Sequence, residues 1–248
     1  MKLCILQKDN INIQEYEKII KKLDFTIDDK NPDFILTFGG DGTILKAVDI
    51  AIKYDIPIIP VNFGKIGYMA DIEKEELEEV LVDIKKGDYT LSVRDLLKCI
   101  IDDKKYYALN DVVFKSEHIS EYELYENDKY ITRYRGDGLI ISTSTGSSAY
   151  AMSAGGSLIH PSLKVMNIVA IAPQTLSARP IILPPISLNI KSSSNIYIDG
   201  LKVSGDNTSL INVSFSDKRI KLINSKTKTY YDILKTKLEW LGYKWKKY

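Results

Sequence analysis

The sequence has few cysteines and no excess of charge of either sign. Its 248 residues include two cysteines, Cys4 and Cys99, which are too few for a disulfide framework and lie in no metal-binding spacing. Lys and Arg number 34 and Asp and Glu 33, so the formal net charge is +1. This balance gives no electrostatic argument for a nucleic acid or a membrane as partner, and we expect neither.

Long hydrophobic runs, histidine and arginine are also scarce. No apolar run approaches the ~20 residues of a membrane span, and the N-terminus has no signal-peptide core. We therefore expect a cytoplasmic protein in a reducing compartment. We expect neither His118 nor His160 to be a metal ligand or a catalytic base. The few arginines include Arg135, and each is a stronger candidate for bidentate anion binding than any single lysine.

The pattern of apolar residues predicts an α/β domain followed by an all-β domain. Residues 2–6, 33–38 and 57–62 read as strands, with helical periodicity at 13–23, 44–51 and 77–84 and a helix end at Gly87. From Tyr89 the segments are short and β-branched or aromatic, and they predict strands at 98–102, 105–115, 121–126 and 130–134, with a turn at 126–129. A short helix is expected within 147–154.

The last 20 residues again have helical spacing, with Leu234, Leu238 and Leu241 on one stripe. A single helix of this length is marginal in water, so we expect it to dock on the first domain. The predicted architecture is a Rossmann-like domain of residues 1–90 and 225–248 and a β-sandwich domain of residues 91–224. We expect the active cleft at the junction of the two domains.

The strongest local signal is Gly39-Gly40-Asp41-Gly42-Thr43, where a strand ends and a helix begins. Such a turn points backbone N–H groups outward at the positive end of the helix dipole and is typical of phosphate binding. A carboxylate among phosphates is useful if it holds Mg²⁺ or accepts a proton from an attacking hydroxyl. The alternative is a structural turn with Asp41 as N-cap.

Two further segments are candidates for ligand binding. Between Ser142 and Ser148 only Gly146 interrupts a run of hydroxyl residues, which offers hydrogen bonds to a polar ligand, and Tyr150 offers a ring for stacking. The alternative is a loop that caps a short helix. Asn110-Asp111, before an apolar strand, is suited to an adenine edge or a ribose diol but is also an ordinary turn pair.

These segments together, in this order, resemble the NAD kinase family. The matching stretches are residues 39–43 (GGDGT), 62–70 (NFGKIGYMA), 109–113 (LNDVV) and 136–183. The GGDGT element is shared with lipid kinases and, more loosely, phosphofructokinases, whereas the 136–156 element is much more specific. Two departures are Ser148, where Thr is usual, and Leu201, where Gln often follows the Asp-Gly pair.

The resemblance implies an enzyme that transfers the γ-phosphoryl group of ATP to the 2′-hydroxyl of the adenosine ribose of NAD⁺. The catalytic carboxylate would be Asp41, and the glycine-rich turn predicts phosphate binding by Gly39, Gly40, Gly42 and Thr43. The implied NAD-binding residues are Asp41, Gly42, Lys65, Tyr68, Asn110, Asp111, Arg135, Asp137, Ser148, Ala149, Tyr150, Ser153 and Ala172. Mg²⁺ or another divalent cation is expected with ATP, or with polyphosphate in its place, but the sequence indicates no metal ligands.

Two other functions fit parts of the pattern. A lipid kinase would share the two-domain plan but would need an apolar cleft where residues 142–150 are rich in hydroxyls. A dinucleotide sensor would bind NAD without turnover, and the carboxylate of Asp41 argues against it. In proteins that this one resembles, the segment of Arg135 and Asp137 reaches the dinucleotide site of a neighbouring subunit. The resemblance therefore implies a homodimer or homotetramer.

Overall fold

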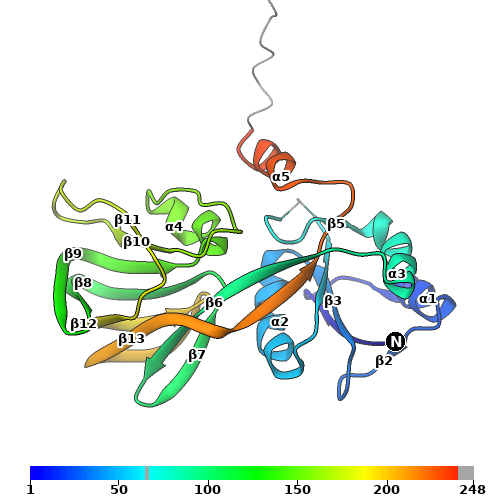
Figure 1. Ribbon diagram of the computed structural model, residues 1–248, viewed down its shortest axis with the longest axis horizontal. Coiled ribbons are helices and arrows are strands. Elements are labelled where there is room, and N and C mark those ends of the chain that lie inside the picture. Colours follow the sequence, from blue (N-terminus) through cyan, green and yellow to red (C-terminus); the bar gives the residue numbers. More distant parts are fainter. Residues whose placement is uncertain (65–66, 240–248) are drawn as a thin grey trace, which may run out of the picture. The chain divides into compact units, whose positions relative to one another are not determined.

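The chain folds into two compact units (Figure 1). The computed structural model describes residues 1–64 and 67–239, apart from the side chains of residues 206–209. Unit 1 contains Met1–Val93 and the chain from Ile220 onward, and unit 2 contains Arg94–Arg219. The boundaries between the units lie inside the long strands β6 (Leu91–Ile101) and β13 (Leu201–Ile223). They therefore differ by a few residues from the domain boundaries predicted at residues 90 and 225.

Unit 1 is a parallel sheet with helical connections. The strand order is β13-β4-β3-β1-β2, β5 also pairs with β4, and these pairings are parallel. Its strands are β1 (Lys2–Gln7), β2 (Thr26–Ile27), β3 (Phe34–Gly39), β4 (Ile58–Asn62) and β5 (Ile72–Glu73). Its helices are α1 (Gln14–Lys22), α2 (Asp41–Tyr54), the 3₁₀ turn η1 (Lys74–Glu76), α3 (Leu77–Lys86) and α5 (Tyr230–Lys237). This is the Rossmann-like arrangement that the sequence predicts.

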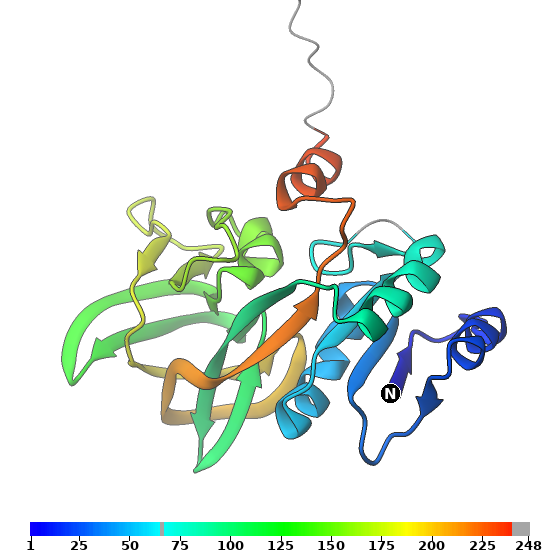
Figure 2. The same cartoon turned by 45° about the vertical axis from the view of Figure 1, so that its right-hand side comes forward.

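The centre of unit 1 is β3, which is buried at every residue, as expected of an inner parallel strand. Phe38 of this strand lies against Tyr16 and Phe63, with ring centroids 5.4 and 5.5 Å away. Figure 2 shows β3 leading directly into α2 (light blue). Gly87, with a φ of +73°, terminates α3 as predicted.

Unit 2 is built from strands, and its ladder runs β11-β10-β9-β8-β12-β13, with β6 paired to β7 and β13. The strands that follow β6 are β7 (Lys104–Ala108), β8 (Asp111–Glu126), β9 (Lys129–Ser142), β10 (Met166–Ile171), β11 (Ile181–Leu183) and β12 (Leu188–Ile198). One buried cluster, with Tyr122 and Phe114 as its largest members, joins β6 and β7 to β8, β9, β10 and β12. The unit thus encloses its core in the manner of a β-sandwich, as predicted.

Two predictions of local structure need correction. The strand expected at 105–115 is two strands, since the chain turns at Leu109 and Asn110 between β7 and β8. The short strands expected at 121–126 and 130–134 are the ends of the long strands β8 and β9. Their predicted turn is confirmed, with Asn127 and Asp128 both at positive φ. The short helix within 147–154 is found as the 3₁₀ turn η2 (Thr145–Ser148) and α4 (Tyr150–Ser153).

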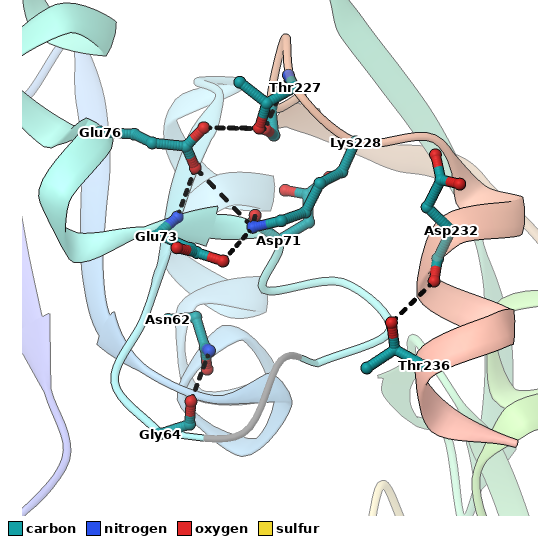
Figure 3. A network of polar contacts seen from close by, with 10 residues as sticks. Asn62, Gly64, Asp71, Glu73, Glu76, Thr227, Lys228, Asp232 and Thr236 are labelled. Atoms are coloured by element: carbon teal, nitrogen blue, oxygen red, sulfur yellow. Dashed lines mark hydrogen bonds and ion pairs between the residues drawn. The ribbon is translucent and has the colours of Figure 1, made fainter. Parts of the chain in front are cut away.

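Polar contacts join the C-terminal segment to the β5–η1 region of the same unit (Figure 3). Lys228 Nζ lies 2.6 Å from Glu73 Oε1, and Thr227 Oγ1 donates to Glu76 Oε1 at 2.6 Å. Helix α5 follows, and its Leu234 is buried, whereas Leu241 of the predicted stripe lies outside the described residues. None of the described helices is long and apolar enough to cross a bilayer.

Candidate active site

The glycine-rich turn joins β3 to α2. Gly40 is the N-cap in an extended conformation and Asp41 is the first helical residue, so the N-cap alternative for Asp41 is wrong. A Cβ at Gly39 would lie 2.0 Å from Thr43 Oγ1, so this position requires glycine. A Cβ at Gly40 or Gly42 would meet nothing within 4 Å. The helix N-terminus therefore has open space over Gly40 and Gly42, whereas Thr43 is buried and its N–H donates to the Gly40 carbonyl.

The Asp41 carboxylate is held by the backbone of the loop that follows β4. Its Oδ1 accepts hydrogen bonds from Met69 N and Ala70 N, both at 3.0 Å, and its Oδ2 accepts one from Tyr68 N at 2.9 Å. A carboxylate has about four acceptor positions, two on each oxygen. Three are used, so Oδ2 retains one position for a further donor.

Gly67 allows this loop to pass so close to Asp41. A Cβ on Gly67 would lie 2.2 Å from Asp41 Oδ1 and 3.1 Å from Ala70 N. Tyr68 follows Gly67, and the pKa of its hydroxyl is raised by burial and then by the charge of Asp41. Lys237 Nζ of α5 lies 5.3 Å from the centre of the Tyr68 ring. Lys65, expected to line this loop, lies outside the described residues.

Unit 2 carries a pocket of about 510 Å³. Its walls come from the β7–β8 turn, the first half of β8, the start of α4, the end of β12, the β12–β13 turn and the start of β13. The lining residues are Asn110, Asp111, Val113, Lys115, Ser116, Glu117, Ala149, Tyr150, Asn195, Tyr197, Asp199, Gly200 and Lys202. Four predicted NAD-binding residues, Asn110, Asp111, Ala149 and Tyr150, thus share one cavity of a size usual for small-molecule sites.

Hydroxyls of the hydroxyl-rich loop are hydrogen-bonded to backbone carbonyls, and none of residues 142–148 lines the pocket. Thr143 Oγ1 donates to Leu109 O at 2.6 Å, Ser147 Oγ donates to Ser144 O at 2.7 Å, and Ser144 Oγ donates to Leu163 O. Residues 142–147 are buried, so the expectation that this run of hydroxyls faces a ligand is wrong for them. The hydroxyls of Thr143, Ser144 and Ser147 satisfy backbone carbonyls that the tight turn would otherwise leave unpaired.

The predicted site residues of this segment are its more accessible ones. Ser148 and Ala149 are half-buried, and Tyr150 and Ser153 are exposed. The Ser148 hydroxyl donates to Thr145 O at 3.1 Å, and Ser153 is not among the pocket residues.

Arg135, Asp137 and Ala172 form a separate group. Arg135 and Asp137 are exposed on β9, on either side of buried Gly136. A Cβ on Gly136 would lie 2.9 Å from Ala172 O, so Ala172, with a φ of +43°, lies against this strand. None of the three lines the pocket of unit 2. Leu201 follows Gly200 as a side chain that is 73% exposed.

The buried carboxyl of Asp111 gives stability a specific pH dependence. Burial, and next the charge of Asp199, raise the pKa of Asp111 to about 7. The folded state therefore holds this proton more tightly than the unfolded state between about pH 4 and pH 7, and its stability falls as pH rises through that window. We expect the free energy of unfolding of wild type to fall by about 2–3 kcal/mol between pH 5 and pH 8 because of Asp111. The Asp111→Asn variant should not show this decrease.

Urea denaturation of both proteins at pH 5 and pH 8 measures this difference. Parallel changes in the two proteins would mean that Asp111 ionises in the folded state as readily as in the unfolded chain.

Two residues of these sites were missed by sequence reasoning. Gly67 enters the sequence analysis only within the matching stretch 62–70, and Asp199 only as the aspartate of the Asp-Gly pair before Leu201. Asp199-Gly200 is a strong hairpin-turn signal, but no local pattern indicates where the Asp199 side chain reaches.

The fold and the carboxylate at the glycine-rich turn define a kinase of the GGDGT type, which transfers a phosphoryl group to a hydroxyl. Comparison with known proteins narrows the class. Two family models match, the ATP-NAD kinase N-terminal domain over residues 7–89 and the ATP-NAD kinase C-terminal domain over residues 109–231. The chain belongs to the ATP-NAD kinase family.

Individual relatives agree with this assignment. An NAD kinase of Clostridium botulinum (strain Kyoto / Type A2) is 37% identical over 221 residues, covering 84% of this chain and 79% of the relative. An NAD kinase of Bacteroides fragilis (strain ATCC 25285) is 33% identical over 253 residues, covering 96% and 87%.

Solved structures match the fold. Yeast NADH kinase complexed with NADH has a TM-score of 0.84 at 22% identity, covering 100% of this chain and 89% of that one. An NAD kinase from Archaeoglobus fulgidus in complex with ATP has a TM-score of 0.83 at 24% identity, covering 96% and 99%.

Proposed function

We propose that this chain phosphorylates NAD⁺ with ATP. The 2′-hydroxyl oxygen of the adenosine ribose attacks the γ-phosphorus, the bond from that phosphorus to the β–γ bridging oxygen breaks, and the products are NADP⁺ and ADP. Family membership supports the reaction, and the geometry of Asp41 carries the assignment of its base.

Asp41 is the proposed general base. Met69 and Ala70 occupy Oδ1, so the incoming hydroxyl would donate to the remaining position on Oδ2. The backbone N–H groups fix the carboxylate before substrate binds, and little reorganisation is then needed at the reaction step. The proton leaves the ribose hydroxyl for Oδ2 as the new O–P bond forms.

The triphosphate is the proposed ligand of the open helix N-terminus at Gly40 and Gly42. Its negative charge is favoured there by the helix dipole and by N–H groups of the first turn. No cluster of three or more His, Cys, Asp or Glu suited to a metal occurs among the described residues. A Mg²⁺ ion bound mainly by substrate phosphates needs few protein ligands, so we propose that the divalent cation enters with ATP or polyphosphate and neutralises phosphate charge.

The pocket of unit 2 is the proposed dinucleotide site. Asn110 and Asp111 would bond polar edges of the nucleotide, and the exposed ring of Tyr150 would stack on a base. With its raised pKa, the Asp111 carboxyl carries a proton in part of the population near neutral pH and is then able to donate as well as accept.

A single coupled assay tests the function. The purified protein is given NAD⁺ with ATP, NAD⁺ with polyphosphate, or diacylglycerol with ATP, each with and without EDTA. We expect NADP⁺ and ADP from the first pair, and loss of product with EDTA. Product from diacylglycerol would favour the lipid-kinase alternative, and NAD⁺ binding without turnover under all conditions would favour a sensor.

We further propose a cytoplasmic homodimer or homotetramer in which Arg135 and Asp137 serve the dinucleotide site of a neighbouring subunit. Both cysteines are buried and unpaired, as a reducing compartment would favour. The exposed position of Arg135 and Asp137, outside the lining of their own unit's pocket, supports the assignment to a neighbour's site.

Subunit mixing tests this assembly. We expect Arg135→Ala to weaken NAD⁺ binding, and mixtures of Arg135→Ala with Asp41→Asn chains to regain part of the lost activity. The gain arises because some mixed sites receive a wild-type Asp41 and a wild-type Arg135 from different chains. Absence of a gain, with subunit exchange verified by mass, would mean that each site belongs to one chain.

A further inference from the structure

The turn that carries Asn110 and Asp111 is fixed by one distant carboxylate. Asp199 accepts hydrogen bonds from three successive backbone groups, Leu109 N at 2.7 Å, Asn110 N at 2.8 Å and Asp111 N at 3.0 Å. It lies about ninety residues further along the chain. The contact therefore depends on the β12–β13 hairpin being placed beside the β7–β8 turn.

The carbonyl groups of the same turn are also bonded. Thr143 bonds the first two carbonyls: its Oγ1 donates to Leu109 O at 2.6 Å and its N donates to Asn110 O at 2.9 Å. The third carbonyl, Asp111 O, accepts a hydrogen bond from Asp199 N at 3.1 Å. Every backbone N–H and C=O of Leu109–Asp111 thus has a partner. These bonds favour one backbone conformation of the turn, and that conformation sets the direction of its side chains.

We propose that Asp199 is a positioning residue for the dinucleotide site, acting through the backbone that presents Asn110 and Asp111 to the pocket. This inference rests on the proposed function for its ligand. Asp199 itself has a φ of +47° and is followed by Gly200 at +85°, the geometry of a two-residue hairpin turn. Asp tolerates this conformation, and its carboxylate has acceptor positions for all three N–H groups.

An asparagine at position 199 would fit the hairpin turn but would not reproduce the three hydrogen bonds to the carboxylate. Its amide has one oxygen, so three N–H groups would compete for two acceptor positions, and its NH₂ group would face other donors. The bonds that are lost are charge-assisted ones, which contribute more than neutral hydrogen bonds. The expected consequence is a looser turn and weaker binding of the dinucleotide.

The same carboxylate acts on Asp111 through its charge. Asp111 and Asp199 line one pocket, where the other ionisable side chains are Lys115, Glu117, Lys202, Tyr150 and Tyr197. The negative charge of Asp199 raises the pKa of Asp111 further than burial alone does. Removing that charge is expected to lower the pKa of Asp111 and to move the pH dependence of dinucleotide binding toward lower pH.

The test compares Asp199→Asn with Asp102→Asn. Asp102 has a φ of +46° in the exposed turn between β6 and β7, so it is a matched hairpin aspartate outside the pocket. For Asp199→Asn we expect KM for NAD⁺ to rise about 10-fold or more with KM for ATP unchanged, and the pH profile of NAD⁺ binding to shift as above. Asp102→Asn should change none of these quantities. Equal behaviour of the two variants would overturn the proposal.

Two further measurements separate this inference from the proposed function. Hydrogen exchange at the Leu109–Asp111 amides needs no ligand, and we expect it to be faster in Asp199→Asn than in wild type. Unchanged exchange would overturn the anchoring role even if NAD⁺ binding were lost, whereas a wild-type protein that binds no NAD⁺ would overturn the function alone. If Asp199→Asn fails to fold, the Asp199→Glu variant is used instead, since it keeps the charge. We expect it to show a wild-type pH profile of NAD⁺ binding and faster hydrogen exchange at the turn. A shifted pH profile would contradict the role of the charge.

Discussion

Replacing Asp41 with asparagine is expected to lower kcat by about 100-fold or more, while binding of NAD⁺ stays measurable. A ribose hydroxyl is a poor nucleophile at neutral pH, and an amide has no basic oxygen to take its proton. The amide NH₂ group would also face the N–H donors of Tyr68, Met69 or Ala70. Steady-state kinetics and NAD⁺ titration of the purified variant measure the two effects separately.

Asp49 supplies the control for this variant. It lies on the same helix and is exposed, so Asp49→Asn removes a carboxylate from α2 without touching the turn. We expect wild-type kcat from it. An Asp41→Asn protein with near-wild-type kcat would remove Asp41 from the mechanism.

Much of the fold is predictable from local pattern. Strand β3 is a run of suitable length in which Thr37 is the one polar side chain, and Gly39 and Gly40 mark its end. Gly87 and the pair Asn127-Asp128 occupy left-handed positions that few other residue types adopt readily, so the sequence alone locates both turns. The strand predicted at 105–115 runs through the β7–β8 turn because Leu109 continues the apolar pattern, although the pair Asn110-Asp111 also reads as a turn. The carboxylate that bonds the backbone of this turn comes from Asp199.

The sequence predicts which residue types form the candidate site, but it does not predict their hydrogen-bond partners. The hydroxyls of Thr143 and Ser147 suggested ligand contacts, yet both are used by nearby backbone groups that only the folded loop brings within reach. Asp41 was expected to face phosphates, and its contact with Met69 and Ala70 depends on a loop from another strand. Side-chain composition indicates what a segment is able to bond, whereas tertiary placement decides which partner it finds.

Replacing Gly67 with alanine is expected to lower kcat about 100-fold with no change in the chemical groups of the site. The added Cβ would lie 2.2 Å from Asp41 Oδ1 and 2.9 Å from Cγ, so the carboxyl or the loop has to move. A displacement of about 1 Å at a reacting group is enough for a loss of this size. Gly205→Ala is the control, because a Cβ on that strand residue would lie 4.0 Å from Asn195 Oδ1, an ordinary van der Waals distance. Kinetics and thermal unfolding of both variants measure the effect and verify folding.

A double-mutant cycle shows whether Gly67 acts through Asp41. If the methyl group lowers kcat only by displacing the carboxylate, Gly67→Ala has little further effect on kcat in an Asp41→Asn background. The two single losses of about 100-fold would then combine to far less than their product. Full multiplication of the losses would mean that the loop and the carboxylate contribute independently, and that the three backbone hydrogen bonds to Asp41 serve the stability of unit 1 rather than the orientation of its base.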